Sequence, residues 1–66
     1  MTVINGKPEA EAAGKNLADY LKEKGYPEAG IAVEINGVII KKSEYPGRVI
    51  GGEDVIEIVS FVGGGW

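Results

Sequence analysis

The spacing of apolar residues along the first half of the chain predicts a short hairpin followed by a helix. Thr2-Val3-Ile4 is rich in β-branched residues and precedes Asn5-Gly6, a pair that tolerates the positive φ angles of a tight hairpin turn. Residues 8–12 are expected to form a weak return strand at a sheet edge, because Pro8 lacks the backbone N–H that a central strand needs.

The next segment, residues 17–24, carries a helical period. Its apolar positions at i, i+3 and i+4 share one stripe and are Leu17, Tyr20 and Leu21. Asn16 can cap the first turn, because its side-chain oxygen can accept a hydrogen bond from the backbone there. Gly25 and Pro27 end the segment, since glycine favours the left-handed residue after a helix and proline prevents continuation.

The second half of the chain is predicted to contain three more strands. Residues 31–35 alternate between apolar and other residues, which is typical of a half-buried strand. Asn36-Gly37 marks a turn, and residues 38–40 form the return strand. Both Asn-Gly pairs are interpreted as turns and nothing else. Residues 43–54 are rich in turn formers, with a helical turn expected near residues 43–45, and Arg48 is given no role beyond a surface ion pair.

The strongest strand signal is residues 55–62, and Glu57 sets its parity. A charged side chain should face water, which places Ile56 and Ile58 on the inner face. Val55, Val59 and Phe61 share the outer face with Glu57 and form an exposed patch, and such patches often mark partner surfaces. The predicted docking patch consists of Val59, Phe61 and Val62; packing of these side chains against a neighbouring loop is the alternative.

The order of elements predicts one α+β domain over residues 1–66. One helix with a single apolar stripe packs across one face of a mixed five-stranded sheet. The hairpins are antiparallel, and the first and last strands can pair in parallel through a right-handed crossover that contains the helix. This is a β-grasp, ubiquitin-like arrangement; an α+β sandwich with another strand order is the alternative.

Composition excludes several classes of function. The chain has 66 residues and no cysteine or histidine, so disulfides, a thiolate nucleophile, a zinc site of the usual ligands and a Ser-His pair are absent. Without a general acid-base or nucleophile constellation, the protein is not expected to be an enzyme. A net charge of −3 argues against a nucleic-acid partner. No apolar run exceeds three residues, so neither a membrane span nor a secretory signal is expected. The expected location is the cytoplasm. The expected oligomeric state is a monomer.

The chain ends in Gly63-Gly64-Gly65-Trp66, which predicts a flexible tail over residues 63–66. Together with the rest of the chain, this ending resembles the ThiS family, the ubiquitin-like sulfur carriers of thiamine biosynthesis. The segments that carry the resemblance are Val3 to Gly6, the helix with Leu17, Tyr20 and Leu21, Ile31 to Gly37, Lys42 to Tyr45, and Asp54 to Gly65.

The resemblance implies a β-grasp fold and a carrier function. A ThiF-type enzyme would adenylate the terminal glycine with MgATP, and a persulfide donor would convert the adenylate to a thiocarboxylate. The thiocarboxylate would then give its sulfur to thiazole synthase. On this chain Gly65 would carry the sulfur, Gly63 and Gly64 would thread the partner's channel, and the carrier itself would bind no metal or cofactor.

Trp66 departs from the family pattern, in which the chain ends at the glycine. We expect a peptidase to remove Trp66 and expose Gly65; a peculiarity of this sequence is the alternative. Two other functions remain open beside thiazole formation. One is sulfur delivery to another pathway, such as molybdopterin or amino-acid biosynthesis, and the other is a ubiquitin-like protein modifier. A plain β-grasp binding module without C-terminal chemistry is a third.

Overall fold

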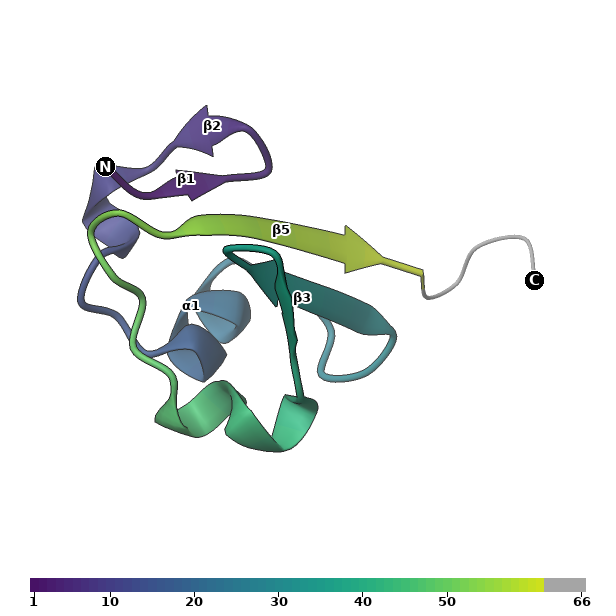
Figure 1. Ribbon diagram of the computed structural model, residues 1–66. Helices are drawn as coiled ribbons and strands as arrows, with labels where there is room; N and C mark the ends of the chain where they lie inside the picture. Colours follow the sequence, from purple (N-terminus) through teal and green to yellow (C-terminus); the bar gives the residue numbers. More distant parts are fainter. Residues whose placement is uncertain (62–66) are drawn as a thin grey trace.

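The computed structural model describes residues 1–61, which form a mixed five-stranded sheet crossed on one face by an α-helix (Figure 1). The strands follow the order β2-β1-β5-β3-β4 across the sheet. Strands β1 and β5 pair in parallel, and every other neighbouring pair is antiparallel. The elements are β1 (Val3–Ile4), β2 (Lys7–Pro8), η1 (Ala10–Ala12), α1 (Leu17–Glu23), β3 (Ile31–Ile35), β4 (Val38–Ile40), η2 (Lys42–Gly47) and β5 (Val55–Ser60), where η denotes a 3₁₀ helix.

Helix α1 begins at the predicted residue, Leu17, and ends at Glu23, one residue before the predicted end, with Lys24 as its C-cap. The side-chain oxygen of Asn16 accepts hydrogen bonds from the backbone N–H groups of Ala18 (2.9 Å) and Asp19 (3.3 Å), so two of the unpaired donors of the first turn are satisfied. Gly25 adopts a φ of +83°, which is open to glycine at little cost. The predicted cap and stop are therefore confirmed.

The core lies between α1 and the inner face of the sheet, and η2 covers one side of it (Figure 1). The three residues of the helical stripe are buried, and so are Ile56 and Ile58, which confirms the strand parity that Glu57 indicates. Burial of a large aliphatic side chain contributes about 1.5–3 kcal/mol. The core consists of Ile4, Ala12, Leu17, Tyr20, Leu21, Val33, Ile35, Tyr45, Ile50, Ile56 and Ile58.

The predicted return strand over residues 8–12 is wrong in extent. Strand β2 is only two residues long, and the chain then turns into η1. The N–H of Glu9 still donates to the carbonyl of Thr2 at 2.8 Å, but the N–H of Ala12 donates back to Glu9 at 3.1 Å. This turn places the Ala12 side chain in the core, where it is wholly buried. Burial of Ala12 therefore takes precedence over continued pairing.

Two smaller differences concern the second half of the chain. The helical turn expected near residues 43–45 is confirmed, and η2 extends it to six residues with Tyr45 buried. The last strand ends at Ser60, and Val62 lies outside the described residues. Among residues 1–61, no helix has the length and apolar character needed to cross a lipid bilayer.

A matched pair of substitutions tests which face of the sheet is buried. Ile56 is 0% exposed and Ile39 is 66% exposed, although both lie on strands. We expect Ile56→Val to lower the free energy of unfolding by about 0.5–1.5 kcal/mol, because it leaves space in a packed core. Ile39→Val should change it by less than about 0.5 kcal/mol. Urea titrations of both variants measure the difference, and equal effects would contradict the assigned parity.

Candidate functional site

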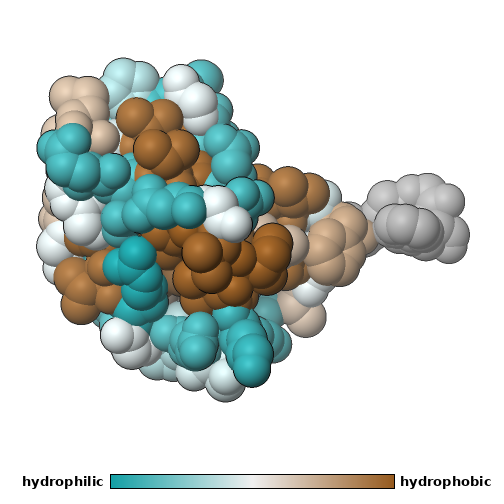
Figure 2. Space-filling view, in the orientation of Figure 1, coloured by the Kyte–Doolittle hydropathy of each residue, from teal (hydrophilic) through white to brown (hydrophobic). Residues whose placement is uncertain are grey.

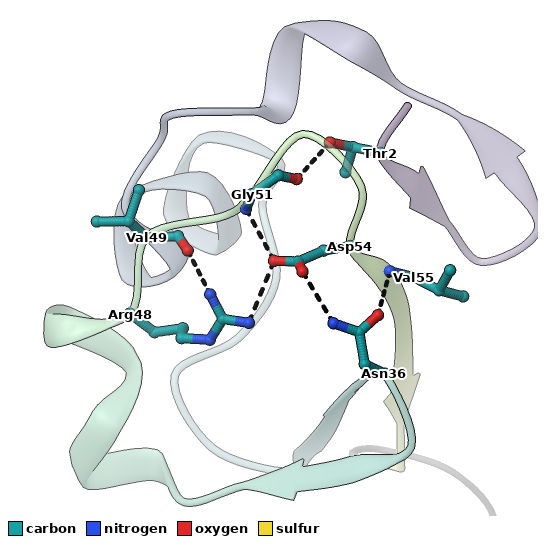
Figure 3. Close-up of polar contacts among 7 residues, drawn as sticks. All are labelled: Thr2, Asn36, Arg48, Val49, Gly51, Asp54 and Val55. Atoms are coloured by element: carbon teal, nitrogen blue, oxygen red, sulfur yellow. Dashed lines mark hydrogen bonds and ion pairs between the residues drawn. The ribbon is translucent and has the colours of Figure 1, made fainter.

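The turn that leads into β5 is built around the carboxylate of Asp54 (Figure 3). Oδ2 accepts hydrogen bonds from the N–H of Gly51 at 2.8 Å and from the guanidinium of Arg48 at 3.1 Å. Oδ1 accepts one from the side-chain amide of Asn36 at 2.9 Å, and the amide oxygen of Asn36 in turn accepts one from the N–H of Val55 at 2.9 Å. These bonds attach the β3–β4 turn to the first residue of β5.

The same contacts set the acidity of this carboxyl group. The backbone hydrogen bond from Gly51 is the largest cause, and it holds the pKa of Asp54 below its ordinary value of 3.8. The amide of Asn36 and the charge of Arg48 act in the same direction, while burial opposes them. Asp54 is therefore ionised at neutral pH, and all three partners donate to a full negative charge.

The N-terminal strand is joined to this turn as well. The hydroxyl of Thr2 is buried and donates to the carbonyl of Gly51 at 2.7 Å (Figure 3). The N–H of Val3 donates to the carbonyl of Asp54 at 2.9 Å. Consequently β1, the β3–β4 turn and the start of β5 are held by one connected set of hydrogen bonds.

Asn5 continues the pairing of β5 beyond the point where β1 turns away. Its N–H donates to the carbonyl of Ile56 at 2.9 Å, and its side-chain oxygen accepts a hydrogen bond from the N–H of Ile58 at 2.7 Å. A side chain thus takes the place of the next backbone carbonyl in the ladder. Since these groups are partly buried, the bond satisfies a donor that would otherwise cost free energy.

The interpretation of the Asn-Gly pairs is therefore right about the turns and wrong about the asparagine side chains. Asn5 and Asn36 have φ angles of +52° and +53°, and the glycines that follow have +81° and +85°. Both asparagine side chains also bind β5. Arg48 likewise bonds Asp54. Gly51 and Arg48 lie three and six residues before Asp54, whereas the bonds of the two asparagine side chains join residues that are 18 or more apart in the chain.

Backbone and side-chain hydrogen bonds thus fix β5 from its first residue up to the last described residue of the chain. The N–H of Phe61 donates to the carbonyl of Gly30 at 2.8 Å, one residue after the strand ends. The residues that follow lie outside the described part of the chain: Val62 of the predicted docking patch, the predicted tail residues Gly63 and Gly64, the predicted attachment residue Gly65, and Trp66. The described part therefore ends at a residue whose backbone is held to Gly30.

The second part of the candidate site is the sheet face that points away from α1. Cross-strand register places together the odd-numbered residues of β5 and their neighbours on β1, β3 and β4. We call this surface the outer sheet face; it consists of Val3, Ala32, Glu34, Ile39, Val55, Glu57, Val59 and Phe61. Val59 is 57% and Phe61 49% exposed, so the described part of the predicted docking patch is open to solvent.

The outer sheet face is larger than the sequence pattern of β5 indicates. Val3 pairs with Val55, and Ile39 lies opposite Glu34, so two further strands contribute apolar surface. These additions depend on strand register, which the sequence alone does not give.

Figure 2 shows apolar surface near the middle of one side of the molecule, bordered by polar side chains. Among residues 1–61, no group of three or more acidic side chains is arranged to hold a metal ion.

A mixed sheet with the last strand at its centre and one helix across it defines a β-grasp protein. The model of the ThiS family matches residues 2–65, and the chain belongs to that family. The chain is similar to the crystal structure of the thiamine biosynthesis protein ThiS from Geobacter metallireducens, with a TM-score of 0.76 and 27% identity over 97% of each chain.

Curated relatives fall into two groups. The sulfur carrier protein ThiS of Thermus thermophilus is 35% identical over 98% of this chain and 100% of its own length. Thiazole synthases of Magnetococcus marinus and Paramagnetospirillum magneticum are 36% and 38% identical over 94% and 96% of this chain. The chain spans only 19% of the length of each synthase, so the similarity concerns one segment of those proteins.

The acidity of Asp54 generates a prediction for stability. Because its folded-state pKa lies below 3.8, its ionised form contributes stability above about pH 4, and this contribution is lost as the pH falls through the folded value. We expect Asp54→Asn to lower the free energy of unfolding at pH 7 by about 1–3 kcal/mol, since hydrogen bonds to a charged group are weakened.

The variant should also show a shallower loss of stability between about pH 4 and pH 2 than the parent protein. Denaturant titrations across this range measure both effects. Glu28→Gln removes a carboxylate from an exposed loop and serves as the control. An unchanged pH profile for Asp54→Asn would contradict the role given to this carboxylate.

Proposed function

We propose that this protein is a sulfur carrier of thiamine biosynthesis and that Gly65 is the residue that carries the sulfur. The observation that carries the proposal is the family match, which runs along the chain to residue 65. Its full-length similarity to a sulfur carrier protein ThiS supports the same conclusion. The protein would act as a co-substrate of other enzymes, and its own side chains would take no part in the covalent steps.

The chemistry requires activation of the Gly65 carboxylate, because a free carboxylate is a poor electrophile. In the proposed route a carboxylate oxygen attacks the α-phosphorus of MgATP on a ThiF-type enzyme and pyrophosphate leaves. The terminal sulfur of a persulfide donor then attacks the acyl carbon and displaces AMP. A thiol cleaves the resulting acyl disulfide, which leaves the thiocarboxylate and a new disulfide.

Trp66 has to be removed before the first of these steps, because Gly65 is joined to it by a peptide bond. Hydrolysis by a peptidase consumes one water and leaves the Gly65 carboxylate. The extra residue would otherwise displace the terminal carboxylate by about 3.3–3.6 Å. An error of about 1 Å in a reacting position can already cost roughly a hundredfold in rate. The family model matches residues 2–65, so Trp66 lies outside the matched part of the chain.

Glycine at positions 63–65 suits a segment that must enter another protein's active site. Without a Cβ, glycine passes through a narrow channel and adopts conformations that other residues do not reach. Ordering such a segment costs about 1–2 kcal/mol per residue, which main-chain hydrogen bonds in the channel would offset. The anchored end of β5 limits this cost to the residues that enter the channel.

The outer sheet face is the proposed docking surface for the adenylating enzyme and for thiazole synthase. Val59 and Phe61 are exposed and precede the glycine segment by only a few residues in the sequence, and Val62 would extend the patch. Similarity to a segment of two proteins named thiazole synthase supports a synthase as one partner. The cytoplasm and a monomeric state remain predictions from the sequence.

Other uses of the same tail are less well supported. A carrier for molybdopterin or amino-acid synthesis would share the fold and the glycines, but the family and the named relatives favour thiamine. A protein modifier would form an isopeptide bond between Gly65 and a lysine of a target. High-mass conjugates in cell lysates would then appear in place of a thiocarboxylate.

Mass spectrometry tests the carrier function. Chains ending at Gly65 and at Trp66 are incubated with the ThiF-type enzyme, MgATP, a persulfide donor and a thiol. We expect only the chain ending at Gly65 to gain the adenylate and then to exchange one oxygen for sulfur. A variant lacking Gly64 and Gly65 should gain neither. Modification of the longer chain at the Trp66 carboxylate would contradict the processing step.

A matched pair of valines tests the docking surface. Val59 on the outer sheet face is 57% exposed, and Val49 outside the sheet is 55% exposed. We expect Val59→Glu to weaken binding to the adenylating enzyme by about tenfold or more, because an unpaired carboxylate would be buried in the interface. Val49→Glu should leave the affinity unchanged, and circular dichroism should show both variants folded. Equal affinities would remove Val59 from the docking surface.

A further inference from the structure

The centre of the outer sheet face holds two carboxylates in direct opposition. Glu34 on β3 and Glu57 on β5 are register partners. Side chains at such positions have Cβ atoms about 4.5–5.5 Å apart, and like charges there are destabilising. Within the described part of the chain, the direct ion pairs all involve other residues, so neither Glu34 nor Glu57 has a cation in contact with it. The free fold therefore maintains an unfavourable pair on its surface.

Apolar side chains border this pair on three sides. Val55 and Val59 lie two residues before and after Glu57 on the same face of β5, and Ile39 lies directly across from Glu34. These three side chains are 48%, 57% and 66% exposed. Any partner that covers them removes water from the two carboxylates as well. Buried carboxylates without a counter-charge are costly, so the partner has to supply a cation.

A guanidinium fits this arrangement better than an ammonium. It offers five N–H donors in a planar fork, whereas lysine offers a single charged point, and one arginine can thus donate to two neighbouring carboxylates. Its flat faces can also pack against the apolar border. Arg48, the single arginine of this chain, already bonds Asp54, so a second copy of the chain is a poor source of this group.

We propose that the outer sheet face docks onto a partner protein that presents an arginine between Glu34 and Glu57, surrounded by apolar side chains. The inference rests on the proposed carrier function, which makes the adenylating enzyme the partner. The net charge of −3 favours approach to a basic surface, and the carboxylate pair then fixes the position of the carrier on it. The pair accordingly specifies the partner at the expense of the stability of the free domain.

Two consequences of opposite sign follow for isosteric variants. Glu34→Gln or Glu57→Gln removes the repulsion, and the midpoint of thermal unfolding should rise by about 1–4 °C. The same changes remove a charge-assisted hydrogen bond to the partner, and the affinity should fall by about tenfold or more. A merely structural or solvating role for the two glutamates predicts no loss of affinity.

The test is calorimetric titration of the chain ending at Gly65 with the ThiF-type enzyme of the same cells, at low and high salt, together with thermal unfolding of each variant. Glu28→Gln is the control, because it removes the same charge from an exposed loop off the sheet. We expect weaker binding and higher unfolding temperatures for the two sheet variants only. The double variant should lose less affinity than the two single losses combined, since one guanidinium serves both carboxylates.

The possible results separate the two proposals. Binding of the parent chain that neither glutamine variant weakens would overturn the arginine contact and leave the carrier function standing. Failure of the parent chain to bind the enzyme would overturn both. Sedimentation that shows a dimer of this chain dissociated by Glu57→Gln would assign the face to self-association and would also overturn the inference.

Discussion

The central position of β5 is the constraint on which the rest of the structure depends. A strand between two neighbours must satisfy backbone groups on both edges, and unpaired groups in a buried setting are costly. Strand β3 serves one edge along its length, whereas β1 is only two residues long. On the β1 edge, the side-chain oxygen of Asn5 accepts a hydrogen bond from the next N–H of β5, that of Ile58. At the start of the strand, the side-chain oxygen of Asn36 accepts one from the N–H of Val55. The parallel pairing of β1 and β5 then requires the crossover that places α1 on one face.

This arrangement separates two kinds of surface on one strand. The inner side chains of β5 enter the core, and the outer ones meet no covering element within residues 1–61. Because the helix occupies one face only, the opposite face stays available to other proteins. Phe61 precedes the first residue of the glycine segment by two positions in the sequence. Docking through the outer sheet face would therefore place the segment at the partner without any change in the fold.

The elements and the parity of the strands could be predicted from the sequence because they depend on local periodicity. The stripe of α1, its Asn16 cap and the alternation around Glu57 are all patterns within a few residues. Other features depend on neighbours far along the chain. The bonds between the Asn36 and Asn5 side chains and β5 span 19 and 53 residues, and no local sequence pattern predicts them. The strand predicted over residues 8–12 is too long, because the chain turns into η1 after Pro8 and buries the Ala12 side chain in the core.

The residues of the candidate site also fall into those that a local sequence pattern predicts and those that depend on strand pairing. Val59 and Phe61 could be found from the pattern of one strand, while Val3, Ile39 and the opposition of Glu34 to Glu57 required the register of three pairings. Stability and recognition also make different demands on this face. A sheet selected for stability alone would place a lysine opposite one of the glutamates or cover the valines. Retention of two facing carboxylates within exposed apolar surface is better explained by a partner that supplies both the covering and the positive charge.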